Sequence, residues 1–433
     1  MADIVSSLAT RAAAAAAVAI GTTLAWWTLS YFMSPLRRYP GPFLAGWTNL
    51  WRLCLVRSNN YQKRIKELHD EHGPVVRIGP NILDLDLPEL IKKIYTTDGK
   101  WLKTGKPCTW DMVGASTFSK NFGYMEKGCD HDGTIGIADK AIDYFSVVGQ
   151  MPFLDSLLDK NPVFRIGPPN LGNVTGIALG HIAARKQGID ENYDPKVPDF
   201  LQSFLNAQEA QPDVVHDGMI LNYVFVNLIA GADTTAISLR AVLYFLMRHP
   251  EVLKKLQAET SQAGFDTKVA QYNKARALPY LEAVIRESMR LHPGVGMLLE
   301  RWVPVEGLTL PDGSVVPGGT VVGINPYVVG RNKKIWGDDA DAFRPERWLQ
   351  NDEETNDDYA ERMRLFNGTD LAFGAGSRIC MGRHFSMIET YKLIATLVNR
   401  YNMEWTDPSK EWEVAQVWFP RQKGIICNLS MRQ

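Results

Sequence analysis

The chain lacks an excess of either charge and any regular arrangement of cysteines. It has 47 Lys and Arg against 48 Asp and Glu in 433 residues, so the basic excess typical of nucleic-acid binding is missing. Its five cysteines form no C-x-x-C pair, which argues against a disulfide framework or a zinc site. This pattern suits a reducing compartment, where a single cysteine can act as a thiolate. With 45% hydrophobic residues, the chain can bury a large core.

Charge is also absent from one stretch near the N-terminus. Residues 12–33 carry no charged side chain, and as a helix they would extend about 33 Å, enough to cross a bilayer. Arg37 and Arg38 follow directly, and the positive-inside bias places the rest of the chain in the cytoplasm. We therefore expect residues 1–38 to be a membrane anchor with its basic flank. The alternative is a cleaved signal peptide, because alanine-rich segments supply small-residue cleavage sites.

After this segment, helical patterns dominate and the predicted strands are short. Apolar periodicity predicts helices over 61–72, 88–95, 219–247, 278–291 and 383–401. Strands are predicted over 75–79, 82–85 and, in small pieces, within 301–324. The stretch 219–247 is apolar enough for a second membrane span, but polar and charged residues interrupt it, so we expect a buried helix. The predicted fold class is mainly α with small β-sheets, with 39–433 as one domain.

A glycine-rich segment with a lone cysteine, residues 373–382, precedes the last predicted helix. Gly374 and Gly376 allow unusual backbone angles and the close approach of a flat ligand. Cys380 would face the positive N-terminal end of the next helix, which favours its thiolate. Such a thiolate is suited to one axial position of haem iron. The alternative is a glycine-rich turn that carries an inert buried cysteine.

The same segment resembles the haem-binding signature of the cytochrome P-450 superfamily, F-x-x-G-x-R-x-C-x-G, at every fixed position. The resemblance implies a cytochrome P-450 fold with an N-terminal transmembrane helix. It implies that Cys380 is the axial ligand of the iron of haem b and that Arg378 contacts a propionate. Phe373 would pack near the sulfur, and Gly374 would also border the cofactor. The chain is most similar in pattern to the fungal microsomal branch that includes pisatin demethylase.

A second segment, residues 230–235, is similar to the oxygen-binding helix of that family. Gly231 in the middle of a helix costs about 1 kcal/mol, which indicates a packing reason such as a flat cofactor. The resemblance implies that Thr234 hydrogen-bonds dioxygen or water and that Asp233 relays protons. The alternative for Thr234 is a hydroxyl bonded back to its own helix.

Further residues match the family's structural motifs. Glu287 and Arg290 lie three residues apart and so share a helix face; their resemblance to the E-x-x-R motif implies a buried pair, which Arg347 would complete. Arg301 is implied to reach a haem propionate. The resemblance also implies a distal pocket, although each member could equally be plain core packing: Phe225, Ala230, Val295, Met297, Leu298 and Trp418.

The chain departs from the family pattern in one place. Tyr95 and Trp110 are almost adjacent, where the family normally has several helices, and no W-x-x-x-R occurs between Gly79 and Gln150. We therefore expect the domain to be incomplete near residues 96–110, through a shortened gene model, a splice variant or a true variant. The missing part would cover one haem edge, and losing it would admit water and weaken oxygen activation.

The resemblance implies a monooxygenase that inserts one oxygen atom from O2 into a lipophilic small molecule, in secondary metabolism or detoxification. Its electrons would come from NADPH through NADPH–cytochrome P-450 reductase. The chain would be single-pass in the endoplasmic reticulum membrane with its catalytic domain cytosolic, and without nucleic-acid partners. Two alternatives stay open: a reductase-independent isomerase or dehydratase of the same fold, and a catalytically impaired, haem-poor isoform.

Overall fold

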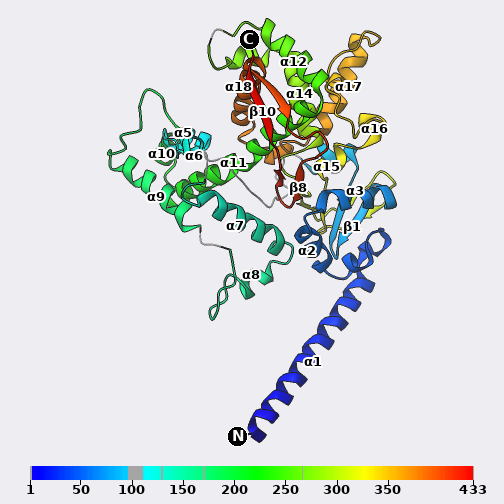
Figure 1. Ribbon diagram of the computed structural model, residues 1–433. Helices are drawn as coiled ribbons and strands as arrows, with labels where there is room; N and C mark the ends of the chain where they lie inside the picture. The colour runs from blue at the N-terminus through cyan, green and yellow to red at the C-terminus, as the bar shows by residue number, and fades with distance from the viewer. Residues whose placement is uncertain (1, 96–110, 128–129, 169–170, 266, 433) are drawn as a thin grey trace.

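The computed structural model describes residues 2–95, 111–127, 130–168, 171–265 and 267–432. Its first element, α1 (Ala2–Met33), projects from a body of helices with small sheets (Figure 1). The base of α1 is held by aromatic stacking: the rings of Tyr31 and Trp47 lie 5.2 Å apart. The helix therefore meets the body at its C-terminal end.

The central element is α11 (Asp217–Arg248), a 32-residue helix that runs between two groups of helices (Figure 1). On one side it contacts α5 (Asp111–Phe118), α9 (Gly172–Lys186) and α10 (Phe200–Ala210). On the other it contacts α12 (Pro250–Gln262), α14 (Pro279–Leu291) and α18 (Arg383–Arg400). Among the described residues, α11 is the one helix with the length and hydropathy of a membrane span. Its packing on both sides confirms the predicted helix inside the body.

A four-stranded sheet lies beside these helices, with the strand order β1-β2-β6-β3. It contains β1 (Val75–Gly79), β2 (Ile82–Leu85), β6 (Val321–Gly323) and β3 (Arg301–Trp302). The β2–β6 pair is parallel, and the outer pairs are antiparallel. The first two strands have the predicted bounds. The distant strand β3 carries Arg301 to the edge of this sheet.

Three two-stranded sheets complete the strand content. They are β4 (Leu308–Thr309) with β5 (Val315–Val316), β8 (Glu413–Gln416) with β9 (Pro420–Lys423), and β7 (Tyr401–Trp405) with β10 (Cys427–Met431). The remaining longer helices are α2 (Leu50–Arg57), α3 (Tyr61–His72), α7 (Thr134–Val148) and α17 (Asn356–Thr369). Shorter ones include α4 (Ile91–Ile94) and α8 (Phe153–Leu157). The predicted class, mainly α with small sheets, is confirmed.

Tyr95 ends the first part of the described chain and is tied to the four-stranded sheet. Its hydroxyl accepts a hydrogen bond from the Ile324 backbone N–H at 2.8 Å and donates one to the Leu299 carbonyl at 3.0 Å. The predicted junction near residues 96–110 lies outside the described residues. Tyr95 thus anchors the chain at the point where that segment begins.

We expect Tyr95→Phe to destabilise the protein by about 1–3 kcal/mol, because it leaves a buried backbone N–H without its acceptor. Chemical denaturation would measure the change. Tyr39→Phe is the control, since the half-buried Tyr39 hydroxyl contacts only side chains, Ser314 and Arg38, and its loss should cost less than about 0.5 kcal/mol. Equal effects of the two substitutions would contradict the structural role of Tyr95.

Candidate active site

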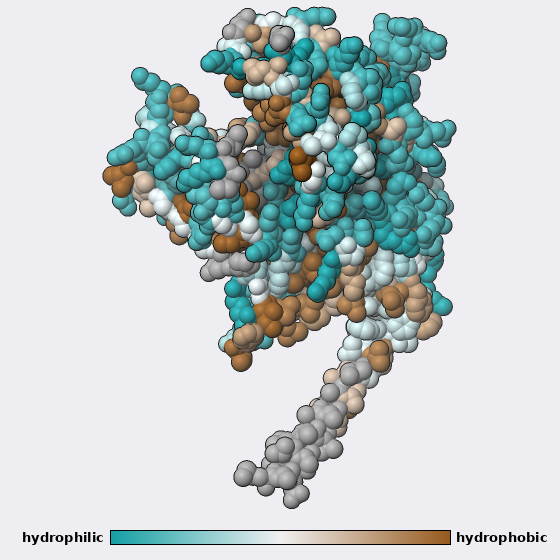
Figure 2. Space-filling model, viewed as in Figure 1, coloured by the Kyte–Doolittle hydropathy of each residue, from teal (hydrophilic) through white to brown (hydrophobic). Residues whose placement is uncertain are grey.

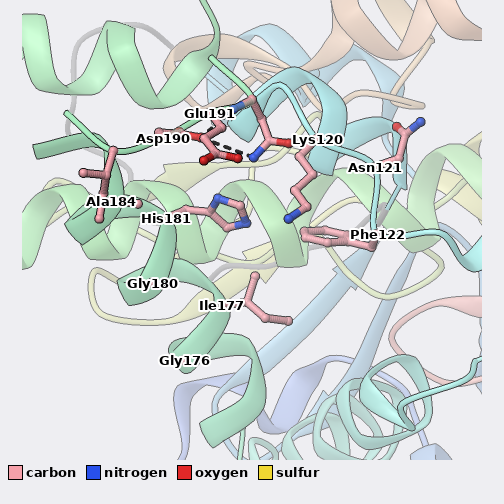
Figure 3. A pocket seen from close by; sticks show the side chains of 12 residues that line it. Lys120, Asn121, Phe122, Gly176, Ile177, Gly180, His181, Ala184, Asp190 and Glu191 are labelled. Carbon is pink, nitrogen blue, oxygen red and sulfur yellow. Dashed lines mark hydrogen bonds between the residues drawn. The ribbon is translucent and has the colours of Figure 1, made fainter. Parts of the chain in front are cut away.

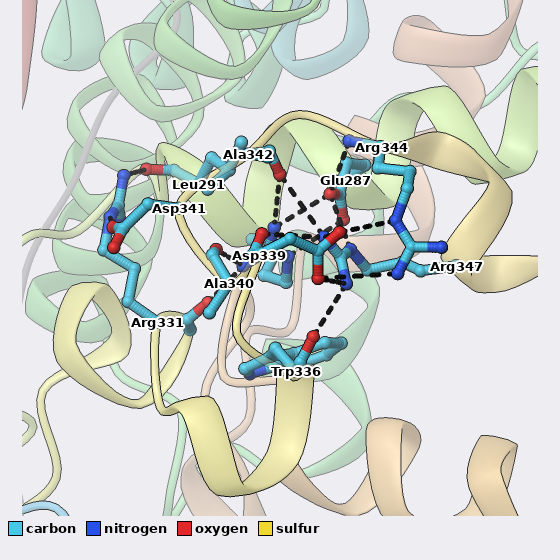
Figure 4. Close-up of polar contacts among 12 residues, drawn as sticks. Glu287, Leu291, Arg331, Trp336, Asp339, Ala340, Asp341, Ala342, Arg344 and Arg347 are labelled. Atoms are coloured by element: carbon cyan, nitrogen blue, oxygen red, sulfur yellow. Dashed lines mark hydrogen bonds and ion pairs between the residues drawn. The ribbon is translucent and has the colours of Figure 1, made fainter.

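The carboxylate of Glu287 on α14 is the centre of a dense network of hydrogen bonds (Figure 4). This side chain is fully buried. Its two oxygens accept hydrogen bonds at 2.8 Å from Nε and Nη2 of Arg290 and from Nε of Arg347. The backbone N–H of Arg344 at 2.9 Å and the indole of Trp348 at 3.0 Å complete the set. The structure therefore brings the three residues predicted to cluster into one network.

The two guanidinium groups of this network also bind backbone carbonyls beyond α14. Arg290 donates to the carbonyls of Gly330, Ala340 (2.6 Å) and Ala342 (3.1 Å). Arg347 donates to the Trp336 carbonyl at 2.9 Å. A buried charge is tolerated when its remaining donors are satisfied in this way. The network thus fastens residues 330–348 to α14.

Cys380 lies in a tight loop directly before α18. Gly374 and Gly376 both have φ of +69°, the left-handed region that favours glycine. The Cys380 N–H donates to the Phe373 carbonyl at 2.9 Å, which closes the loop. The Cys380 thiol is exposed, and a Cβ on Gly382 would meet only that sulfur, at 3.8 Å. The loop therefore presents the sulfur on an open face at the N-terminus of a helix.

Two cations lie near each other at this site without carboxylate partners. Arg301 is 3% exposed and covers the ring of Tyr95 at 4.7 Å. Its Nη1 donates to the Glu300 carbonyl, but its Nε is buried without a partner. Burial, and then the charge of Arg378, lower the pKa of Arg301. None of the described residues forms an ion pair with either guanidinium, so an anionic group is suited to bind between them.

The α11 motif is connected to the first turn of α18. The Thr235 hydroxyl donates to the Ser386 hydroxyl at 3.0 Å. The backbone of Gly294 packs against Thr234, since a Cβ on this glycine would lie 3.5 Å from the Thr234 Cβ. Gly231 and Asp233 are half-buried on the same helix. The contact made by Ser386 was not predicted from the sequence, because a single serine in a helix carries no distinctive pattern.

The residues predicted to form a distal pocket divide between two packed clusters. Met297 and Leu298 are buried with Tyr61 and Ile65 of α3. Phe225 and Val295 pack against a cluster centred on α11, and Trp418 contacts both clusters. The side chain of Ala230 lies outside the described ones. The described members of this set are therefore held in place by core packing.

A cavity of about 460 Å³ opens elsewhere, between α9 and the segment that follows α5 (Figure 3). Gly176, Gly180, His181 and Lys120 contribute to its lining. His181 stacks on Phe118 with ring centres 4.1 Å apart, and burial lowers the pKa of its imidazole. None of the predicted site residues lines this cavity, so it is separate from the Cys380 site.

Comparisons with known proteins agree on one family. The family model described as cytochrome P-450 matches residues 106–427. The chain is 39% identical to the cytochrome P-450 monooxygenase cfoH of Aspergillus candidus, over 96% of this chain and 92% of that protein. It is 30% identical to the cytochrome P-450 monooxygenase vrtE of Penicillium aethiopicum, over 96% and 94%. A cytochrome P-450 monooxygenase of Aspergillus terreus is 31% identical, over 86% and 92%.

We expect Glu287→Gln to destabilise the protein by about 3–5 kcal/mol, because the substitution leaves the buried Arg290 guanidinium without its counter-charge and leaves Arg347 to the more exposed Asp339 carboxylate. Urea unfolding would measure the loss. Glu282→Gln on the same helix is the matched control, since Glu282 is only half-buried, and its removal should cost less than about 0.5 kcal/mol. A Glu287→Gln protein as stable as the control would contradict the network's importance.

Proposed function

The chain belongs to the cytochrome P-450 family and is a monooxygenase, and from this premise we propose that Cys380 is the axial ligand of haem b. The observation that carries the proposal is the exposed thiol beside the unpaired cations Arg301 and Arg378. These donors fit the group: a thiolate for iron and two guanidinium groups for the carboxylates of its edge. When bound, haem supplies the iron at which dioxygen is reduced.

Each residue of the Cys380 loop has a definite part in holding the cofactor. The positive end of α18 favours the Cys380 thiolate, because the unpaired N–H groups of a helix start stabilise negative charge. Gly382 and Gly374 leave the surface beside the sulfur free of side chains. Phe373 holds the loop closed through its carbonyl. Arg301 and Arg378 orient the propionate edge.

The helix α11 would provide the groups that handle protons. We propose that Thr234 hydrogen-bonds dioxygen or a water and that Asp233 passes protons to it, with Gly231 leaving room for the flat cofactor. One oxygen atom enters a C–H bond of a lipophilic substrate, and the other leaves as water after two protons and two electrons are consumed. The electrons come from NADPH through NADPH–cytochrome P-450 reductase. The apolar side chains near Trp418 suit a lipophilic substrate.

We place the reaction in fungal secondary metabolism or detoxification. The similar proteins are fungal monooxygenases, and their similarity extends over nearly all of this chain. The assignment rests on that relatedness and on the lipophilic character of the site. Direct turnover assays with lipophilic compounds would identify the substrate within this class.

A haem-poor, impaired form is the second candidate, because the chain is shorter than its relatives. The alignment with cfoH runs over 497 positions, yet 96% of this 433-residue chain supplies only about 416 of them, so about 80 positions have no counterpart here. The family match also begins only at residue 106. Both observations support a domain, 39–433, that is incomplete near 96–110. Haem in such a domain would be more exposed to water.

Membrane attachment is proposed from α1 and from the end of the body where it joins. The helix α8 and the segment after it lie at that end (Figure 1), and Figure 2 shows apolar residues gathered there. The exposed apolar side chains of α8 and this segment are Phe153, Leu157, Val163, Phe164 and Ile166. An exposed apolar surface beside a helix that carries no charge over residues 12–33 suits a membrane interface. We place the protein in the endoplasmic reticulum membrane, with the catalytic domain in the cytosol.

Cys380→Ser is expected to abolish the strongly red-shifted Soret band of the reduced, carbon-monoxide-treated protein, because a hydroxyl cannot replace the thiolate ligand. A carbon monoxide difference spectrum would measure it. Cys54→Ser is the control, since this cysteine is also exposed but lies on α2, and the band should persist. A band that persists in Cys380→Ser would contradict the assignment of Cys380 as the iron ligand. No band in the unsubstituted protein would favour the haem-poor form.

The double substitution Val18→Lys with Leu24→Lys should release the protein from microsomal membranes. Each lysine at the centre of a spanning helix costs about 2.5–3.5 kcal/mol. Flotation in a density gradient would measure the change. The apolar pair Val18→Ile with Leu24→Phe should float like the original protein. Unchanged flotation of the lysine variant would show that α1 is not the anchor.

A further inference from the structure

Arg421 on β9 connects three carboxylates from two helices. Its Nε lies 3.4 Å from an oxygen of Asp233 on α11. Its Nη1 and Nη2 lie 2.6 Å from Asp143 and 3.1 Å from Asp139, both on α7. A single guanidinium thus joins β9, α7 and α11 at the acidic residue proposed to relay protons.

Negative charge exceeds positive charge at this junction. Arg240 on α11 is the other cation that faces the group, and its guanidinium donates to Gln422 at 3.3 Å. The side chains of Asp233 and Arg421 are only 14% and 15% exposed. Three carboxylates therefore share two cations around a nearly buried Asp233–Arg421 pair, which disfavours full ionisation.

Asp139 and Asp233 are a pair that shares this excess, because the same Arg421 guanidinium lies 3.1 Å from Asp139 and 3.4 Å from Asp233. Burial, and then the charge of Asp233, raise the pKa of Asp139 to about 7, and Asp143 adds to the effect, whereas Arg421 opposes it. Two neighbouring carboxyl groups hold one proton between them more readily than two charges. At neutral pH and below, the pair therefore keeps a proton beside α11.

We propose that Asp139 is a positioning residue that holds a proton against Asp233, while Arg421 fixes the Asp233 carboxylate, so that α7 controls proton delivery to Thr234. This inference rests on the proposed role of Asp233 as the relay. The Asp139 side chain is 36% exposed, so it can take a proton from water. The shared proton passes from Asp139 through Asp233 to Thr234, and Asp139 then takes a replacement proton from water, without any change in electron count.

Asp143 is the matched control that the structure offers. It lies one turn further along α7, is more exposed at 45%, and binds the same arginine. It contacts Arg421 and contributes only through its charge to Asp139. Asp143→Asn makes the same substitution on the same helix but leaves the Asp139–Asp233 pair in place.

The test compares Asp139→Asn with Asp143→Asn in the full chain with haem and reductase. The readout is product formed per NADPH consumed, as a function of pH. In the unsubstituted protein this ratio should fall as pH rises through about 7, because the shared proton is lost there. Asp139→Asn should lower the ratio by about 10-fold and remove the inflection. Asp143→Asn should stay within about twofold, and Asp139→Glu should restore most of the ratio.

Infrared spectroscopy of the same proteins reads the shared proton without turnover. A carbonyl stretch from a protonated carboxyl group should titrate near neutral pH, vanish in Asp139→Asn and persist in Asp143→Asn. The inference is overturned if that band survives in Asp139→Asn, or if both variants lower the ratio equally. The carbon monoxide difference spectrum distinguishes a failure of the Asp139 proposal from a failure of the proposed haem site. A normal Soret band with an unaffected Asp139→Asn rejects the relay alone, whereas no band rejects the haem assignment.

Discussion

The buried carboxylate of Glu287 is the constraint on which the arrangement around Cys380 depends. Taking this charge out of water costs several kcal/mol unless its partners are fixed in place. Arg290 and Arg347 meet that condition by binding both the carboxylate and the carbonyls of residues 330–348. A small cavity lined by Arg290 and by Leu371 and Ala372 adjoins this network. The network therefore lies directly beside the segment that leads into the cysteine loop.

Three of the charged clusters among the described residues differ in how their charges balance. At Glu287, every group has its partner, and the cluster is structural. At Arg301 and Arg378, two cations lack an anion, which is the electrostatic condition for binding a carboxylate-bearing cofactor. At Arg421, carboxylates exceed cations, and the surplus is met by retaining a proton. The two sites for which we propose a function thus have unbalanced charge, whereas the charges of the Glu287 network are balanced.

The region that we propose to be incomplete begins next to the same site. Tyr95, the last described residue before it, contacts Arg301. The Tyr95 ring lies under the Arg301 guanidinium, and its hydroxyl is bonded to the sheet. The region that we propose to be incomplete follows just after this residue. A more open site would still keep both cations proposed to bind the cofactor. Arg301 belongs to β3 and Arg378 to the cysteine loop, and the structure describes both segments. An incomplete region near 96–110 would instead weaken the exclusion of water from the proposed cofactor site.

The sequence by itself determined the family, the thiol and the local elements, because each depends on residues close together in the chain. The loop 373–382 carries its own signature, and α3, β1, β2, α11 and α14 follow from periodicity. The pairing of Glu287 with Arg290 was readable for the same reason, as they lie three positions apart on one helix. Only the tertiary structure decided which distant groups meet: Ser386 with Thr235, Tyr95 with Arg301, and Arg421 with Asp139 and Asp233. No local pattern marks these contacts, since the charge of a side chain says nothing of its partner until folding brings α7, α11 and β9 together.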